Sequence, residues 1–358
     1  MSWALAIEKS DISQAMLVDT PSAALEPGQA RLSVQRFALT ANNVTYAAFG
    51  DVMGYWAFFP ADDGHGRLPV WGFAKVSETR CDGLETGERI YGYFPAASEL
   101  VVTPGKLSPG AFVDMTEHRA ALPAAYNRYV RCAGDQGYEA NGEAEQMVLQ
   151  PLFLTSFLLD RYIRAESGFG AARILLTSAS SKTAIALAHL LAKTPIEGIS
   201  VDALTSPGGR DFVDGLDLYS AIHTYDAIAG IPADTPVMIV DFAGDSKVVT
   251  ALHTHLGDRL NANIRVGGAH WENSAPARDL PGPAPSFFFA PTHLETMIGE
   301  IGPRGFQDAY ADAWMEFAKG AKSWLNFQYK SGPKNVLAVY DALVRGDAMA
   351  RDGLVIEV

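Results

Sequence analysis

Length, composition and charge narrow the kinds of protein that this chain can be. It has 358 residues, 48% of them hydrophobic, which predicts two folded domains with substantial cores. The formal net charge of -13 disfavours nucleic acid and anionic membrane surfaces as partners. Such a chain binds a small anion only where a local pocket of cations and N–H groups outweighs the overall charge.

The cysteine count and the apolar segments indicate where the protein resides. Two cysteines, Cys81 and Cys132, exclude a disulfide-stapled scaffold and a four-cysteine zinc site, and we interpret both as free thiols. The N-terminal residues do not have the pattern of a secretory signal. The longest apolar stretches are shorter than the span of about 20 residues that a membrane helix needs. The sequence therefore predicts a cytoplasmic protein that does not enter the membrane.

The first 140 residues or so have the pattern of a β-rich domain. Residues 30–40 alternate between apolar and polar side chains, as a half-buried strand does. Residues 68–79 and 87–104 are short apolar segments broken by Gly and Pro. Short strands at this spacing predict a small barrel or sandwich. The polar, Gly-containing residues 132–145 follow as a predicted surface loop or domain seam.

From residue 145 onwards, apolar strands alternate with helices. Strands are predicted at 172–178, 199–206, 220–226, 236–244 and 261–270, and helices at 145–167, 181–194, 210–216 and 246–258. This alternation is typical of βαβ units, whose parallel sheet is covered by helices on both faces, the doubly wound α/β fold. The tail is largely helical over 286–329 and 336–348. It ends in a strand over 353–358, which we expect to return to the β-rich domain.

The turn between the strand at 172–178 and the next helix is the first candidate for chemistry. In a doubly wound sheet this turn lies at the carboxyl end of a strand, where phosphate binds the helix N-terminus. Small serines stand where glycines are usual, and a lysine adds positive charge. The turn is either a dinucleotide loop or a plain N-cap that begins a helix. The residues assigned here to cofactor binding are Ser178, Ser180, Ser181, Lys182 and Thr183.

The end of the next strand indicates which dinucleotide would bind. An NAD site usually places an acid there for the ribose 2′-hydroxyl, whereas NADP favours a nearby cation. Asp202 comes too early, and the strand ends in Ser206, followed by Arg210. Tyr225 ends the strand after that. A hydroxyl, a guanidinium and a phenol can together hold a 2′-phosphate. The alternative is that Arg210 is merely solvated and Tyr225 belongs to the core.

These motifs resemble the medium-chain dehydrogenase/reductase superfamily, in its zinc-independent quinone-oxidoreductase-like branch. Residues 36–51 resemble the segment in which an Asn and a tight turn face the active cleft. Residues 87–104 resemble the barrel strand that begins at a Gly-Asp-Arg-Val turn. The set Ser206, Arg210 and Tyr225 matches the family's NADPH-selecting residues in order and spacing. Two strand ends, at 241–244 and 264–268, resemble those beside the family's cofactor.

The resemblance implies a domain layout and further site residues. It implies a GroES-like domain over 1–145, completed by about 300–358, with a Rossmann domain over 146–299 between them. It assigns to cofactor binding the strand-end residues Phe242, Ala243, Gly244, Gly267 and Gly268. The serine loop and the segment 287–317 depart from the family pattern. The chain therefore looks like a diverged branch, of the kind represented by families of unknown function within the superfamily.

The aromatic segment over residues 41–60 supplies the candidates for catalysis. Hydride transfer from a nicotinamide needs close approach, exclusion of water and a donor that polarises the acceptor carbonyl. Tyr46 and Asn43 are our candidates for that donor. The alternative is that the aromatic residues form a core or a dimer contact, and the sequence is compatible with a homodimer.

We therefore predict an NADPH-dependent, metal-free reductase of a quinone, an enone or a related carbonyl compound. Two alternatives stay open: a non-catalytic NADP-binding redox sensor or scaffold, and a protein that has lost dinucleotide binding. A hydrolase is disfavoured because the chain has no Gly-x-Ser-x-Gly elbow. A nucleotide kinase is disfavoured because the spaced glycines of a P-loop are missing. The histidines lack the spacing of a zinc site.

Overall fold

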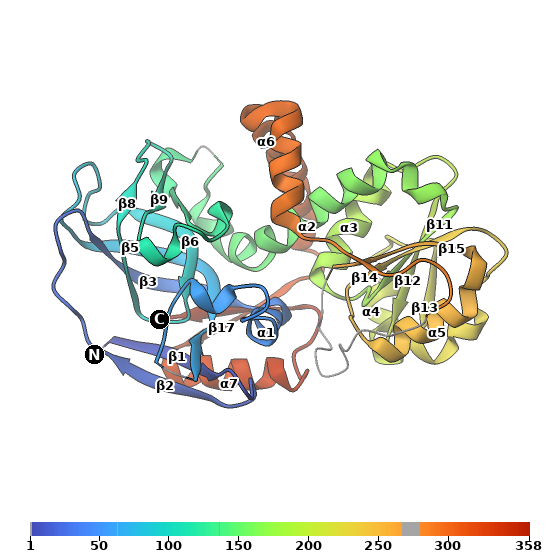
Figure 1. The fold of residues 1–358 in the computed structure, drawn as a ribbon, viewed down its shortest axis with the longest axis horizontal. Coiled ribbons are helices and arrows are strands. Elements are labelled where there is room, and N and C mark those ends of the chain that lie inside the picture. The colour runs from blue at the N-terminus through green and yellow to red at the C-terminus, as the bar shows by residue number, and fades with distance from the viewer. Residues whose placement is uncertain (1, 63, 136, 267–279) are drawn as a thin grey trace. The chain divides into compact units, whose positions relative to one another are not determined.

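The computed structural model describes residues 2–62, 64–135, 137–266 and 280–358 (Figure 1). The chain forms two compact units, one of Met1–Val148 with Leu325–Val358 and the other of Leu149–Trp324. The family resemblance implies that the chain returns to the first domain at about residue 300. Helix α6 (Ala290–Ala321) instead belongs to the second unit, where Phe317 stacks on Phe153 with ring centroids 5.0 Å apart. The return therefore begins later, at Leu325.

The first unit is β-rich, as the short Gly- and Pro-punctuated segments predict. Its larger sheet has the order β17-β18-β3-β5-β6-β10-β9-β8, with β7 pairing with β3, and its smaller sheet has the order β2-β1-β4. These strands are β1 (Ser2–Glu8), β2 (Ala15–Thr20), β3 (Ala30–Leu39), β4 (His65–Arg67), β5 (Pro69–Thr79), β6 (Arg89–Pro95), β7 (Glu99–Val102), β8 (Pro104–Gly105), β9 (Ala111–Asp114), β10 (Arg128–Arg131), β17 (Asn326–Ser331) and β18 (Asp352–Glu357).

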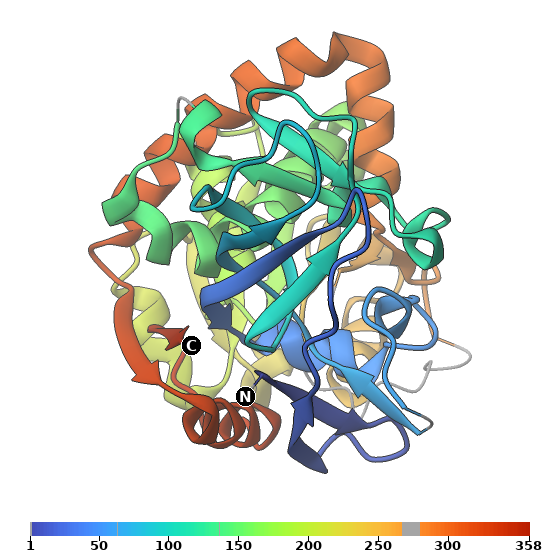
Figure 2. The same cartoon turned by 90° about the vertical axis from the view of Figure 1, so that its left-hand side faces the viewer.

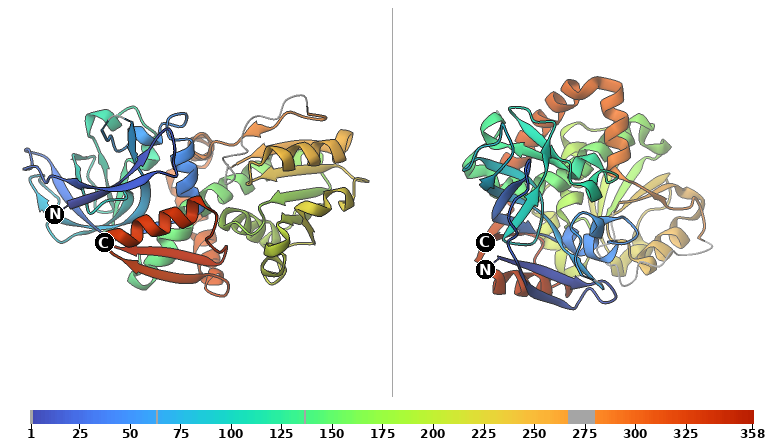
Figure 3. Two further views of the ribbon diagram at one scale, coloured as in Figure 1. Left: turned by 90° about the horizontal axis from the view of Figure 1, so that it is seen from below. Right: turned by 60° about the vertical axis from the view of Figure 1, so that its left-hand side comes forward.

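The C-terminal residues complete this first unit. The final strand β18 pairs antiparallel with β3, and β17 pairs parallel with β18. The preceding helix α7 (Pro333–Val344) packs beside β1 and β2, as the two side views show (Figures 2 and 3). Tyr340 of this helix is buried, and its hydroxyl donates to the Ile12 carbonyl oxygen at 2.8 Å. The expectation that the last strand returns to the β-rich domain is confirmed.

The second unit is built on a parallel sheet in the order β13-β12-β11-β14-β15-β16. The strands are β11 (Arg173–Thr177), β12 (Ser200–Thr205), β13 (Ala221–Thr224), β14 (Val237–Asp241), β15 (Leu260–Arg265) and β16 (Ser286–Phe287). The helices are α2 (Glu143–Ala165), whose first turns belong to the first unit, α3 (Lys182–Lys193), α4 (Arg210–Asp214), α5 (Ser246–Leu256) and α6. The α/β class, a GroES-like β-rich domain with a Rossmann doubly wound domain, is confirmed.

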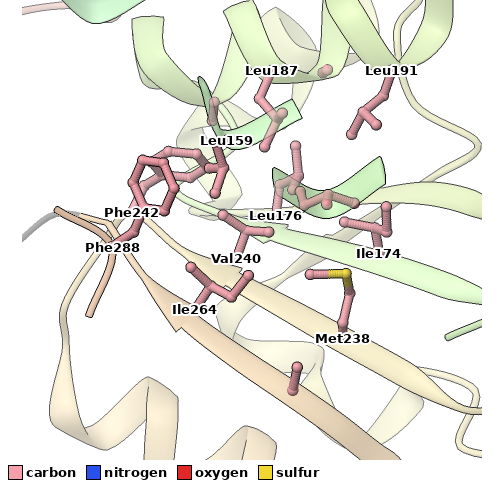
Figure 4. Packing of buried hydrophobic residues seen from close by; sticks show 14 of the residues in the cluster. Leu159, Ile174, Leu176, Leu187, Leu191, Met238, Val240, Phe242, Ile264 and Phe288 are labelled. Carbon is pink, nitrogen blue, oxygen red and sulfur yellow. The ribbon is translucent and has the colours of Figure 1, made fainter. Parts of the chain in front are cut away.

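Apolar side chains cover both faces of the parallel sheet, as the continuous apolar strands predict. On one face, Ile174 and Leu176 of β11 pack with Leu187 of α3 (Figure 4). On the other face, Leu175 of β11 packs with Leu252 of α5. Successive side chains of β11 thus pack into two separate cores, one on each face of the sheet, which hold the strand in place. Across the described residues, no helix is long and apolar enough to cross a membrane.

Candidate functional site

The loop after β11 lies at the carboxyl edge of the parallel sheet. Ser181 is the N-cap of α3, and its hydroxyl accepts a hydrogen bond from the Ala184 N–H at 3.3 Å. The helix therefore begins on a serine cap, one of the two roles that the sequence allows for this turn. The same position presents the N-terminus of a twelve-residue helix, where N–H groups and the helix dipole favour an anion. Lys182 and Thr183 form its first turn.

Ser178 has a backbone conformation that glycine would adopt without strain. Its φ of 47° lies in the left-handed region, which costs a residue with a Cβ about 1 to 2 kcal/mol. Its N–H donates to the Tyr225 hydroxyl at 2.9 Å, and its carbonyl accepts from the Ser181 N–H at 2.7 Å. Burial raises the pKa of Tyr225 to about 12, so the phenol keeps its proton at neutral pH. Ser178 and Tyr225, both predicted cofactor residues, are therefore in direct contact.

The end of β12 forms a tight turn next to this loop. Ser206 caps the turn by accepting from the Gly209 N–H at 3.2 Å. A Cβ at Gly209 would lie 2.7 Å from Thr205 Oγ1 and 3.7 Å from Ser180 Oγ, so only glycine fits here and Ser180 lies alongside the turn. Ser180 and Ser206 are thus brought together from consecutive strands, as predicted for one edge of the sheet.

Arg210 supplies an exposed cation at the same edge. It begins α4, and its Nη1 donates to the Ile222 carbonyl oxygen at 3.3 Å. The only acid of β12, Asp202, is buried within the strand, where it pairs with Arg173 at 3.0 Å and His223 at 3.2 Å. The end of β12 therefore carries a hydroxyl and a nearby guanidinium in place of a carboxylate.

The end of β14 is organised by a buried carboxylate. Asp241 accepts from the Thr177 hydroxyl at 2.7 Å and from the N–H groups of Ala243 and Gly244, each at 3.1 Å. Burial raises the pKa of Asp241, and the Thr177 hydrogen bond opposes that shift. The Phe242 N–H donates to Thr177 Oγ1 at 3.0 Å. These three N–H groups therefore face the protein, which leaves other atoms of the predicted residues 242–244 to meet a ligand.

Thr177 and Asp241 join the ends of two neighbouring strands. Asp241 begins the predicted motif at 241–244, but neither residue was predicted to bind the cofactor. Both residues end a strand, and the order of the strands reverses between these two strands, which is where ligands bind in such sheets. That position could have identified them from the sequence. The predicted cofactor residues Gly267 and Gly268 lie outside the described residues.

In the first unit, the Asn43 side chain is engaged with its own segment. It belongs to helix α1 (Ala41–Ala48) and is 4% exposed. Its Oδ1 accepts from the Thr40 N–H at 2.7 Å, and its Nδ2 donates to the Pro69 carbonyl oxygen at 2.8 Å. The amide thereby closes a capping box and joins α1 to the start of β5. Asn43 therefore has a structural role, which is to hold α1 in place.

Tyr46, the other predicted catalytic residue, lies on the same helix with a different amide beside it. Its hydroxyl accepts from Trp71 Nε1 at 3.4 Å and is hydrogen-bonded by the Asn42 side chain. Burial raises the pKa of Tyr46 well above its usual value, so the hydroxyl is a proton-bearing donor at neutral pH. The prediction favoured Asn43 over Asn42, its neighbour in the same aromatic segment. The signal for Asn42 was its spacing of four residues from Tyr46, which places both side chains on one helix face.

Other aromatic rings pack around the ring of Tyr46. The Tyr55 ring centroid lies 4.5 Å from that of Tyr46, and Tyr93 stands edge-on to it at 5.7 Å. Tyr93 is fully buried, and its hydroxyl has no hydrogen-bond partner among the residues that the structure describes. A buried hydroxyl without a partner is rare in folded proteins. The surroundings of Tyr46 thus combine aromatic walls with phenol donors.

Replacing Asn43 with alanine is expected to destabilise the fold without affecting dinucleotide binding. The change removes the capping box and leaves the half-buried Thr40 N–H without its acceptor, a cost of about 1 to 3 kcal/mol in the free energy of unfolding. Urea denaturation of the wild-type and Asn43→Ala proteins measures the difference. The matched control is Asn42→Ala, on the same helix, which should cost less stability. An Asn43→Ala protein of unchanged stability would contradict the structural assignment.

A family model matches residues 37–349 and is described as "Protein of unknown function (DUF2855)". The match extends over most of the chain. The chain belongs to this family. No curated protein matches it. Among the residues that the structure describes, no three His, Cys, Asp or Glu side chains are grouped so that they could hold a metal ion.

Solved structures similar to this family member share its fold at low sequence identity. CurA from Vibrio vulnificus in complex with NADPH has a TM-score of 0.63 and 11% identity, covering 100% of this chain and 99% of that one. The yhdH oxidoreductase from Salmonella enterica in complex with NADP has a TM-score of 0.55 and 13% identity, covering 100% of both chains. The Etr1p complex with NADP and crotonyl-CoA has a TM-score of 0.57 and 9% identity, covering 100% and 99%. The chain therefore has the fold of the medium-chain dehydrogenase/reductase superfamily.

Proposed function

We propose that this protein is an NADPH-dependent, metal-free oxidoreductase that reduces a quinone, an enone or a related carbonyl compound. The observation that carries the proposal is the edge of the parallel sheet, where three neighbouring strand ends present hydroxyls, a phenol and a cation. Ser206, Arg210 and Tyr225 are the residues that we expect to select the 2′-phosphate. The structures of similar fold that were solved with NADPH or NADP support the same class of cofactor.

The residues present at this edge fit a dinucleotide. Gly209 lets the turn after β12 approach Thr205 and Ser180 closely, and Ser178 has a left-handed conformation that is usual for glycine in such loops. We expect the N-terminus of α3, with Ser181, Lys182 and Thr183, to hold the pyrophosphate. A small group of cations and donors can bind one dinucleotide although the whole chain carries a charge of -13.

When bound, NADPH would supply a hydride to the acceptor. We expect Tyr46 to donate a hydrogen bond to the acceptor's carbonyl oxygen, where negative charge develops as the hydride arrives. The raised pKa keeps the proton on this phenol over the neutral range. Asn42 and Trp71 orient the phenol by donating to its oxygen, so that its own proton is directed elsewhere. Asn43 supports α1, on which Tyr46 is carried.

The experiment that tests this activity is a turnover assay. The purified protein is mixed with NADPH and a panel of quinones and enones, and the loss of absorbance of the reduced nicotinamide is followed. Turnover of at least one conjugated acceptor, faster with NADPH than with NADH, is the expected result. Binding of NADPH without oxidation by any acceptor would favour a redox sensor or scaffold. One observation favours that alternative. The Asn43 side chain is hydrogen-bonded within the fold, so that Tyr46 is the one of the two predicted catalytic residues that stays a candidate.

A further inference from the structure

We propose that Tyr219 is a positioning residue that holds the glycine-free loop after β11 in its dinucleotide-binding conformation. The inference rests on the proposed function, because it assigns a role in NADPH binding. Tyr219 lies just before β13, 40 residues after Ala179 in the sequence. Its hydroxyl donates to the Ala179 carbonyl oxygen at 2.9 Å. Ala179 follows Ser178 in the loop, so this bond joins a distant tyrosine to the predicted phosphate loop.

The loop needs such support because it contains a strained serine. Ser178 has a φ of 47° and carries a side chain, whereas the corresponding position of a glycine-rich loop has none. A residue in this conformation persists only where its surroundings hold it there. In a glycine loop that requirement disappears, because glycine adopts left-handed φ values as readily as right-handed ones.

Three hydrogen bonds hold the strained segment from outside the loop. Tyr225 accepts from the Ser178 N–H at 2.9 Å, the Leu204 carbonyl oxygen accepts from the Ala179 N–H at 3.1 Å, and Tyr219 donates to the Ala179 carbonyl oxygen. All the backbone groups of Ala179 are thus satisfied, and its side chain is fully buried. The two phenols thus hydrogen-bond consecutive residues, Ser178 and Ala179, at the point of strain.

The two tyrosines differ in what a ligand would require of them. Tyr225 is half-buried at a strand end, where it can also meet a 2′-phosphate, so its loss would remove two interactions together. Tyr219 packs against Ala179, Ala203 and Val213, and burial raises the pKa of its phenol, which keeps it a donor. Its hydroxyl reaches the loop through the Ala179 carbonyl oxygen, and its ring packs on the same residue. An effect of Tyr219 on affinity would therefore be indirect, through the shape of the loop.

The test compares the dissociation constant for NADPH of the wild type, Tyr219→Phe, Ser178→Gly and the double variant, by calorimetry. Tyr219→Phe removes the hydroxyl and leaves the Ala179 carbonyl oxygen without this hydrogen bond. We therefore expect it to weaken NADPH binding about threefold to tenfold. In the Ser178→Gly background, the same change is expected to alter affinity less than about twofold, because glycine needs no external support. This rescue would not occur if Tyr219 only stabilised the core.

Tyr310→Phe is the matched control. The Tyr310 hydroxyl donates to the Gln150 carbonyl oxygen at 3.2 Å within the same unit, a bond that does not involve Ser178 or Ala179, so this variant should bind NADPH like the wild type. An equal loss of affinity in Tyr310→Phe, or no rescue by Ser178→Gly, would overturn the proposal. If Tyr219→Phe fails to fold, a folded double variant that binds NADPH supports the proposal, and an unfolded one overturns it.

A second measurement separates this proposal from the proposed function. Hydrogen exchange at the Ser178 and Ala179 amides should be faster in Tyr219→Phe than in Tyr310→Phe, with or without any ligand. If the wild type does not bind NADPH, the proposed function fails, while the exchange result still reports whether Tyr219 holds the loop. If the wild type binds NADPH but these amides exchange equally fast in Tyr219→Phe and Tyr310→Phe, the role of Tyr219 is refuted while the proposed function stands.

Discussion

Replacing Arg210 with alanine is expected to weaken NADPH binding about tenfold or more and to leave NADH binding nearly unchanged. Only NADPH carries the 2′-phosphate, and a guanidinium makes charge-assisted hydrogen bonds to it. Arg210 is exposed at the start of α4, where it donates a hydrogen bond to the Ile222 carbonyl oxygen, which at 3.3 Å is long enough to be exchanged for a ligand. Titrations of both proteins with both dinucleotides measure the two ratios.

Arg259→Ala is the matched control for net charge. Arg259 is exposed just before β15, at the amino end of that strand, so its loss removes the same charge from the opposite edge of the sheet. It should alter the affinities for NADPH and NADH equally and weakly. If Arg210→Ala also affected the two dinucleotides equally, its assignment to the 2′-phosphate would be refuted.

Replacing Tyr46 with phenylalanine is expected to lower kcat about a hundredfold while leaving NADPH affinity unchanged. The change removes a donor that acts when negative charge forms on the acceptor oxygen, and it keeps the ring that packs on Tyr55. Because the interaction is made in the transition state, kcat and kcat/KM should fall together. Steady-state kinetics with the best acceptor of the turnover panel measure both constants.

The control for this variant is Tyr340→Phe, which removes another buried phenol from the first unit. Tyr340 bonds the Ile12 carbonyl oxygen and has no assigned role in the reaction, so kcat should be retained. A Tyr46→Phe enzyme with wild-type kcat would show that the phenol belongs to the aromatic core, the alternative that the sequence left open. Asn42→Ala should then also leave kcat unchanged, because its amide acts through Tyr46.

The parallel-sheet unit was largely predictable because its strands are buried on both faces. Continuous apolar runs such as residues 172–178 have few competing explanations, and the observed β11 covers Arg173–Thr177. The edge residues followed from the same logic, since parallel strands place their carboxyl ends together. The domain seam was harder to place. Residues 286–329 read as one helical tail, yet β17 at Asn326–Ser331 belongs to the other unit.

Side-chain partners were the part that sequence could not supply. Asn42 and Asn43 are adjacent amides, and only the start of α1 decides which one caps the helix and which one faces Tyr46. Tyr219 is far from Ala179 along the chain, so no local pattern reveals their hydrogen bond. The left-handed φ of Ser178 is likewise invisible in a sequence where the residue is not glycine. Each of these features depends on tertiary packing.

The most direct test is a titration of the wild-type protein with NADPH and, separately, with NADH. Calorimetry gives both affinities, and the fluorescence of the six tryptophans provides a second signal. Trp324 is a suitable reporter, because its ring lies 6.4 Å from that of Phe212 in α4, the helix that begins at Arg210. We expect saturable binding of NADPH, at least tenfold tighter than that of NADH, by about the energy of one charge-assisted hydrogen bond. No binding of either dinucleotide, or equal binding of both, would contradict the account.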